Sequence, residues 1–269
     1  MDTRQTIGIQ APGTRGERKW AQRIWAIVAL AYLLLTLGPP NVFAAARCVT
    51  PAIEASEQQA LRTDRIALTG DAGRAVDEML LGAHSKALRW DRVPELVVLM
   101  PVMQYEKGRG TQYRATAGLL TGEEADALVA DLTEALLVLS DGVFKGFAAI
   151  RRETPAAGET VNVMRPGQIV VARYQGVRDQ LATIGFGGRS TRNDVIRAGS
   201  IILDNDFDRT SATRRLLRTH ELGHALGYNH VQSRTSIMNS QIGPELTDFD
   251  RAVARVAFQG FKPGVSSCA

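Results

Sequence analysis

Three of the four histidines of this 269-residue chain fall within eleven residues, in the segment HELGHALGYNH at 220–230. If the segment begins as a helix, His220 and His224 lie one turn apart on the same face, so both imidazoles can reach one metal ion. Leu222, Ala225 and Leu226 then lie on the opposite face, for a core. The segment therefore predicts an amphipathic helix whose polar face is part of a metal site.

A third ligand has to come from outside this helix, because a catalytic zinc ion takes three protein ligands and keeps a fourth position for water. Gly227 can end the helix in a left-handed conformation, which turns the chain and brings His230 back toward the ion. Glu221 follows the first ligand directly, and its carboxylate can hydrogen-bond a water at the metal and act as general base. The spacing predicts one zinc ion held by His220, His224 and His230.

These residues resemble the extended motif HExxHxxGxxH of the metzincin clan of zinc metallopeptidases, which the chain matches at all five fixed positions. Metzincins place a methionine-containing turn beneath the zinc site, and Met238 in the segment 236–240 matches it. The chain looks nearest to matrixin-like bacterial forms, although Val231 and Ser240 depart from the residues typical of the subfamilies. The resemblance implies a zinc-dependent endopeptidase with protein or peptide substrates and with Glu221 as its general base.

The resemblance also implies an α+β fold of the zincin type, with a twisted mixed sheet, an active-site helix and a C-terminal helix. By analogy, residues 181–186 form the edge strand that binds an extended peptide, with Thr183 and Gly185 as main-chain contacts. The pocket next to the scissile bond would be walled by Ile242, Gly243 and Pro244, which follow the methionine turn.

Residue patterns along the chain predict the order of the elements. Residues 53–90 have helical spacing with a break at 69–73, and Pro101 places the apolar strand 95–105 at an edge or a bend. Thr121 and Glu124 form a capping-box pattern ahead of a long amphipathic helix. This helix is expected at 123–140, short strands at 147–152, 169–174, 181–186 and 200–204, and two more helices at 211–226 and 248–259, the last capped by Thr247 and Asp250.

The first 46 residues are typical of a secretory signal, because basic residues precede an apolar run at 24–37 and small residues at 44–46 suit a signal peptidase. The alternative is an uncleaved anchor, although residues 39–41 interrupt the run before the roughly 20 residues that a membrane span needs. We therefore expect an exported protein, periplasmic or extracellular, that contacts a membrane only if this segment stays. A helical lead-in at 47–91, either removable or permanent, would precede the peptidase domain at 92–269.

The charge of the chain lies largely in the export segment. The formal net charge is +4, and residues 1–46 hold five basic and two acidic residues, so the mature chain carries about +1. The remainder has no block of lysines and arginines. Nucleic acid is therefore not an expected partner.

Two further ligand or crosslink predictions rest on weaker patterns. Cys48 and Cys268 are the only cysteines, and in an oxidising compartment we expect them to form a disulfide. The alternative is a Cys48 thiolate that blocks the metal site in a latent form. Asp204, Asp206 and Asp208 offer carboxylate oxygens for a calcium ion, with a solvated cap before the zinc-binding helix as the simpler interpretation.

A function of another class stays open at this point. The chain could be an exported zinc-containing module that binds peptides without turnover. Glu221 argues against this alternative, because a site without turnover has no need of a base at that position.

Overall fold

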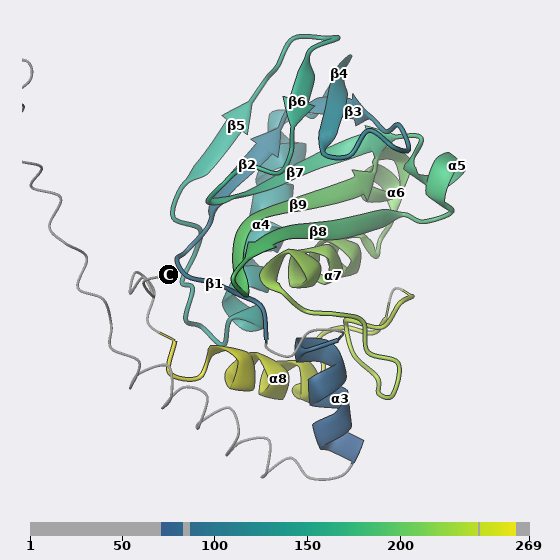
Figure 1. The fold of residues 1–269 in the computed structure, drawn as a ribbon. Helices are drawn as coiled ribbons and strands as arrows, with labels where there is room; N and C mark the ends of the chain where they lie inside the picture. Colours follow the sequence, from purple (N-terminus) through teal and green to yellow (C-terminus); the bar gives the residue numbers. More distant parts are fainter. Residues whose placement is uncertain (1–70, 83–86, 242, 262–269) are drawn as a thin grey trace, which may run out of the picture. The chain divides into compact units, whose positions relative to one another are not determined.

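The computed structural model describes residues 71–82, 87–241 and 243–261, which all belong to the structural unit 48–269. The predicted signal segment, the Cys48–Cys268 disulfide and Ile242 lie outside the described residues. The described elements, labelled in Figure 1, are α3 (Asp71–Leu80), β1 (Arg89–Trp90), β2 (Glu95–Leu99), β3 (Pro101–Gln104), β4 (Gln112–Leu119), α4 (Gly122–Leu139), β5 (Ile150–Glu153), β6 (Thr160–Asn162), β7 (Gln168–Gln175), α5 (Val177–Leu181), β8 (Gly185–Arg192), β9 (Val195–Asp204), α6 (Asn205–Thr210), α7 (Arg214–Leu226) and α8 (Asp248–Phe258). The predicted α+β class and the mixed sheet are confirmed.

Strand β7 occupies the middle of the sheet. It pairs in parallel with β2 and β3 on one side and with β9 on the other, and β5 extends the parallel part beyond β2. Residues 169–174 of β7 are all buried, as expected for a parallel strand that is covered on both faces. The antiparallel strands β4 and β6 extend the sheet from β3.

Strand β8 forms an edge of the described sheet. It runs antiparallel to β9 from Gly185, opposite Leu203, to Arg192, opposite Val195, and β9 is its one strand partner in the described part of the chain. Helix α7 lies next to β8 (Figure 1). The free side of this edge strand is therefore available to an added strand.

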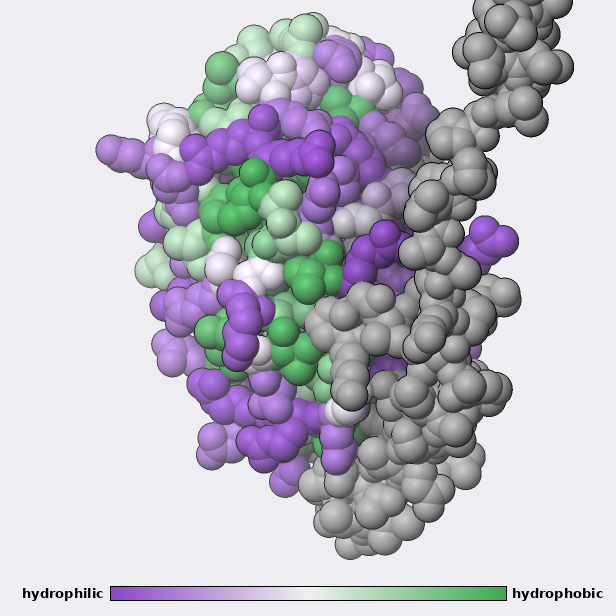
Figure 2. Space-filling model, turned by 90° about the vertical axis from the view of Figure 1, so that its left-hand side faces the viewer, coloured by the Kyte–Doolittle hydropathy of each residue, from purple (hydrophilic) through white to green (hydrophobic). Residues whose placement is uncertain are grey.

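Helices α4 and α7 cover one face of the sheet (Figure 1), and alternate strand residues point to them. In β2, Leu96 and Val98 join the core with these helices, whereas Val97 and Leu99 join a second core on the opposite face. The side seen in Figure 2 is mainly hydrophilic with an apolar band across its middle. The large apolar side chains that stay exposed among the described residues are Leu119, Leu137 and Ile150.

The two predicted helix caps are confirmed. The backbone N–H of Glu124 donates to the Thr121 hydroxyl, and the N–H of Thr121 donates to the Glu124 carboxylate, at 3.2 and 2.8 Å. Thr247 and Asp250 exchange the same pair of bonds at the start of α8. None of the helices in the described ranges is long and apolar enough to cross a membrane.

The prediction of helix through residue 90 was wrong at its end. Residues 89–90 form strand β1, which pairs with the start of β9, and the Trp90 indole N–H donates to the Ala225 carbonyl at 3.0 Å. Pro101 lies at a break between β2 and β3 as one alternative predicted, but β3 has strand partners on both sides, so an edge position was wrong. Long-range pairing decided both points, and local patterns do not report it.

The predicted strand at 181–186 was wrong over residues 181–184. Leu181 ends the short helix α5, Ala182 has a left-handed backbone conformation with φ 53°, and β8 begins only at Gly185. Strands β4 and β6 and helix α6 were not predicted. Strand β5 begins at Ile150 rather than at 147, β9 begins at Val195 rather than at 200, and α7 begins at Arg214 rather than at 211.

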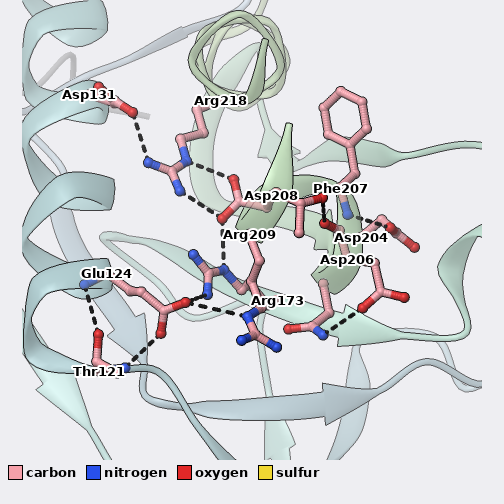
Figure 3. A network of polar contacts seen from close by, with 12 residues as sticks. Thr121, Glu124, Asp131, Arg173, Asp204, Asp206, Phe207, Asp208, Arg209 and Arg218 are labelled. Atoms are coloured by element: carbon pink, nitrogen blue, oxygen red, sulfur yellow. Dashed lines mark hydrogen bonds and ion pairs between the residues drawn. The ribbon is translucent and has the colours of Figure 1, made fainter. Parts of the chain in front are cut away.

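A buried network of charges holds α7 against the rest of the unit (Figure 3). Asp208, on α6, is fully buried and accepts hydrogen bonds of 2.7 Å from Arg173 of β7 and Arg218 of α7. Both arginines also reach α4, where Arg173 pairs with Glu124 and Arg218 with Asp131. Because Arg218 precedes His220 by two residues, this network fixes the start of the metal-binding segment.

We predict that Asp208→Ala lowers the free energy of unfolding by about 3–5 kcal/mol, because it leaves part of the charge of Arg173 and Arg218 buried without its partner. Chemical denaturation followed by circular dichroism measures the change. Asp126→Ala is the control, since it removes an exposed ion pair with Arg152 and should cost at most about 1 kcal/mol. Equal losses in the two variants would contradict the prediction.

Candidate metal centre

Helix α7 and the turn after it bring the three predicted histidine ligands together. The helix ends at Gly227, whose φ of 116° is left-handed, as predicted. A Cβ at this position would also lie 2.3 Å from the Leu88 carbonyl oxygen. Both the backbone conformation and this close contact therefore require glycine. The chain then reverses and places His230 beside His220 and His224.

The three imidazoles point their Nε2 atoms at one another. The Nε2–Nε2 distances are 3.1 Å for His220–His224, 3.3 Å for His220–His230 and 3.0 Å for His224–His230. Two nitrogens bound to one zinc ion at about 2.0–2.1 Å with a tetrahedral angle are about 3.3 Å apart. The three histidines therefore form a group that can hold a metal ion, the one such cluster of His, Cys, Asp or Glu among the described residues.

Backbone carbonyls fix the tautomer of two of these rings. The Nδ1–H of His220 donates to the Ile237 carbonyl at 2.7 Å, and that of His224 donates to the Tyr228 carbonyl at 2.9 Å. Because a carbonyl oxygen only accepts, Nδ1 carries the proton and Nε2 keeps a lone pair for a metal.

Desolvation favours the neutral form of all three rings. Burial lowers the pKa of His220 and, with the neighbouring His220, lowers that of His224 to about 3; desolvation also lowers the pKa of His230, which is the most exposed of the three. Neutral imidazole is the form that binds metals, so protonation does not compete with an ion at neutral pH.

Met238 is buried against the metal-binding helix. Its sulfur lies 2.5 Å from the position that a Cβ on Gly223 would occupy, so Gly223 allows the methionine turn to approach α7 next to His224. The Met238 carbonyl accepts a hydrogen bond of 2.9 Å from Val231, the residue after His230. The methionine turn thus contacts α7 at Gly223, next to His224, and the backbone at Val231, directly after His230.

A buried carboxylate that the sequence analysis assigned only to a helix cap also holds this turn. Asp250 of α8 is fully buried and accepts hydrogen bonds from the Ser236 hydroxyl and, at 3.0 Å, from the Ile237 N–H. The Ile237 carbonyl is the acceptor of His220. Asp250 therefore orients the first ligand through one intervening residue.

Glu221 lies on α7 with its carboxylate buried beside the histidines. The Gly187 N–H donates to this carboxylate, and the Oε2 atom is buried with no hydrogen-bond partner among the described residues. Burial raises the pKa of Glu221 to about 8. A cation held by the neighbouring histidines would favour the ionised form, which leaves a carboxylate oxygen free to take a proton.

One cleft of about 790 Å³ is lined by all three histidines and by Glu221. Thr183 and Gly185, the predicted substrate contacts, line it together with Gly187 of β8. Gly243 and Pro244 do not line it; Gly243 instead lies against the Ser236 carbonyl of the methionine turn. From the segment after Met238, the cleft is instead lined by Ser240 and Gln241, which were not predicted from the sequence.

The three aspartates considered for calcium do not form such a cluster. Asp208 is paired with two arginines, and Asp204 accepts hydrogen bonds from Arg178 and from the Phe207 N–H. Asp204 thereby caps α6, a helix that was not predicted, and Asp204 and Asp208 are buried, so the predicted solvated cap was wrong in this respect. The geometry gives no support to a calcium ion at these residues.

Gly187 and Arg189 of β8 are parts of the site that the sequence analysis missed. A Cβ at Gly187 would lie 2.2 Å from the Glu221 carbonyl oxygen, so β8 and α7 touch through their backbones. Arg189 donates to the His224 and Tyr228 carbonyls at the end of α7. Glycines at 185 and 187 within a strand are a signal of close backbone approach, and this signal was available in the sequence.

No protein-family model matches this chain, and no curated protein matches its sequence. The functional assignment therefore depends on the residues of the site and their geometry.

We predict that Gly187→Ala weakens both the fold and the metal site. The added methyl group meets backbone and the Cβ of His224, so strand and helix must separate, at a cost of about 1–3 kcal/mol. Denaturant unfolding without metal and a zinc titration measure the two effects. Gly118→Ala is the control, because its nearest contact would be an ordinary 3.6 Å; a Gly187→Ala protein equal to the wild type in both assays would refute the packing argument.

Proposed function

We propose that the chain is a zinc-dependent endopeptidase of metzincin type that hydrolyses peptide bonds in proteins or peptides. The observation that carries the proposal is the convergence of three neutral histidine Nε2 atoms, 3.0–3.3 Å apart, beside the unpartnered carboxylate oxygen of Glu221. A structural zinc site is usually closed by four protein ligands, whereas three ligands at an open cleft are typical of a catalytic one.

The donor set favours zinc as the ion. Three neutral imidazoles suit zinc, copper, iron and nickel, and a tetrahedral site with one open position is the common catalytic geometry of zinc. When bound there, zinc supplies Lewis acidity, which lowers the pKa of water to about 7 and polarises a carbonyl group.

Glu221 is the residue that moves the proton. Its Oε2 atom accepts a proton from the attacking water while the water oxygen bonds to the carbonyl carbon of the substrate. The same oxygen then gives the proton to the amide nitrogen as the carbon–nitrogen bond breaks, so that the products are a carboxylic acid and an amine. The Gly187 N–H holds the carboxylate in place during both transfers.

Strand β8 positions the substrate in this proposal. An extended peptide on its free edge continues the sheet and runs past Gly185, Gly187 and the histidines along the cleft. Support for a metzincin-type fold comes from the order of elements. Parallel strands β5, β2, β7 and β9 end in the antiparallel edge β8, α7 carries the histidines, and α8 closes the described chain. Export by the segment at 1–46 is part of the same proposal.

We predict that Glu221→Gln strongly reduces peptide cleavage and keeps the metal. Loss of the general base should lower kcat/KM by about 10²–10⁴-fold, whereas zinc content stays at one ion per chain because Glu221 is not a ligand. Cleavage of a mixed peptide library and elemental analysis measure both quantities. His224→Ala is the matched comparison, since it removes a ligand and should lose zinc and activity together.

The same experiment separates the proposal from its alternative. Zinc bound to a wild-type protein that cleaves nothing would favour a peptide-binding module without turnover. A wild-type protein without zinc would overturn the assignment of the site.

A further inference from the structure

His230 differs from the other two ligands in what surrounds it. It lies outside α7 and is exposed, and the described contacts of its ring are with the Nε2 atoms of His220 and His224. The rings of His220 and His224, by contrast, are each fixed by a backbone carbonyl. The position of the third ligand therefore depends on the backbone segment 229–233 that carries it.

Helix α3 holds this segment on both sides of His230. Before the histidine, the Asn229 N–H and side-chain amide donate to the Met79 carbonyl at 2.8 and 3.2 Å. After it, the N–H groups of Gln232 and Ser233 donate to the two oxygens of Glu78 at 2.6 and 3.3 Å. The Ser233 hydroxyl adds a third hydrogen bond to Glu78 at 2.6 Å.

Helix α3 is itself fixed, so these bonds tie the ligand segment to a rigid element. Val76 and Met79 are buried in the core that also contains α7 and α8. On the opposite side of Asn229, Arg189 of β8 donates to its side-chain oxygen at 2.7 Å. The segment is thus held between α3 and β8.

We propose that Glu78 is a positioning residue for the metal ligand His230, and that helix α3 is thereby a working part of the metal centre. The proposal rests only on the metal-binding part of the proposed function. It also bears on the lead-in, because residues 71–82 must then stay with the protein in its metal-binding form. The lead-in was expected to be either removable or permanent, and under this proposal residues 71–82 are permanent.

The carboxylate form of Glu78 is the one that the segment binds. Desolvation alone would raise the pKa of Glu78, but the hydrogen bonds from the Ser233 hydroxyl and from the two N–H groups outweigh it and lower the pKa. An ionised acceptor makes stronger hydrogen bonds than a neutral one, so one side chain can order three donors of the ligand segment.

The test compares metal affinity in full-length Glu78→Ala, Glu78→Gln and wild-type proteins by competition of zinc with a chelator. Loss of a residue that orients a ligand typically costs 10–100-fold in metal affinity, and we expect about this loss for Glu78→Ala. Glu78→Gln keeps one carbonyl acceptor and should lose less. Glu134→Ala is the matched control, since it removes a different glutamate, the exposed partner of Arg215 on α7, and should leave affinity unchanged within about twofold.

A second readout separates positioning from general stability. The visible absorption of the cobalt-substituted protein reports the ligand set, and it should change in Glu78→Ala, where His230 is no longer held, and stay unchanged in Glu134→Ala. Thermal unfolding of the metal-free proteins shows whether the fold has been weakened. If Glu78→Ala fails to fold, Glu78→Gln carries the test.

The outcomes are distinct from those of the peptidase test. Wild-type affinity and an unchanged cobalt spectrum in the Glu78 variants would overturn the positioning role even if the wild type cleaves peptides. Weakened affinity with a changed spectrum would support the role even if no peptide is cleaved.

Discussion

The Nε2 lone pairs of three neutral imidazoles point at one another across 3.3 Å or less. These lone pairs repel one another unless the protein or a cation compensates for the repulsion. Hydrogen bonds at Nδ1 decide which nitrogen faces inward, and burial keeps the rings unprotonated. Neither effect would hold the rings in place if the helix and the two segments that carry their partners could move. Several other elements of the unit make contacts that prevent this movement.

Each ligand is supported from a different element. His220 is oriented through Ile237 by the buried Asp250 of α8, and His224 is oriented by Tyr228, whose carbonyl also accepts from Arg189 of β8. The segment of His230 is tied to α3. The buried pair of Asp208 and Arg218 then joins the start of α7 to α6, and Arg218 reaches α4. Residues far apart in sequence thus fix one small set of distances.

Local sequence patterns were sufficient for features that depend on neighbours along the chain. The capping boxes at Thr121 and Thr247 and the end of α7 at Gly227 follow from side chains within a few residues, and all three are present. Positions 89–90 and 181–184 were wrong, because pairing of β1 with β9 and the end of α5 at Ala182 decide them. The convergence of the histidines needed only helical geometry and one glycine.

The residues that support the metal ligands were harder to predict, because they too depend on contacts between residues far apart in the sequence. Glu78 precedes its partner Gln232 by 154 positions, and Arg173 precedes Asp208 by 35, and no periodicity links such residues. Gly187 is the instructive exception. A glycine in the middle of a strand marks a backbone that another backbone must approach, and here it allows β8 to lie on α7 close enough for its own N–H to reach the Glu221 carboxylate. The absence of a side chain at Gly187 thus brings the strand edge that would hold a substrate next to the Glu221 carboxylate, which would transfer the proton of the attacking water in the proposed reaction.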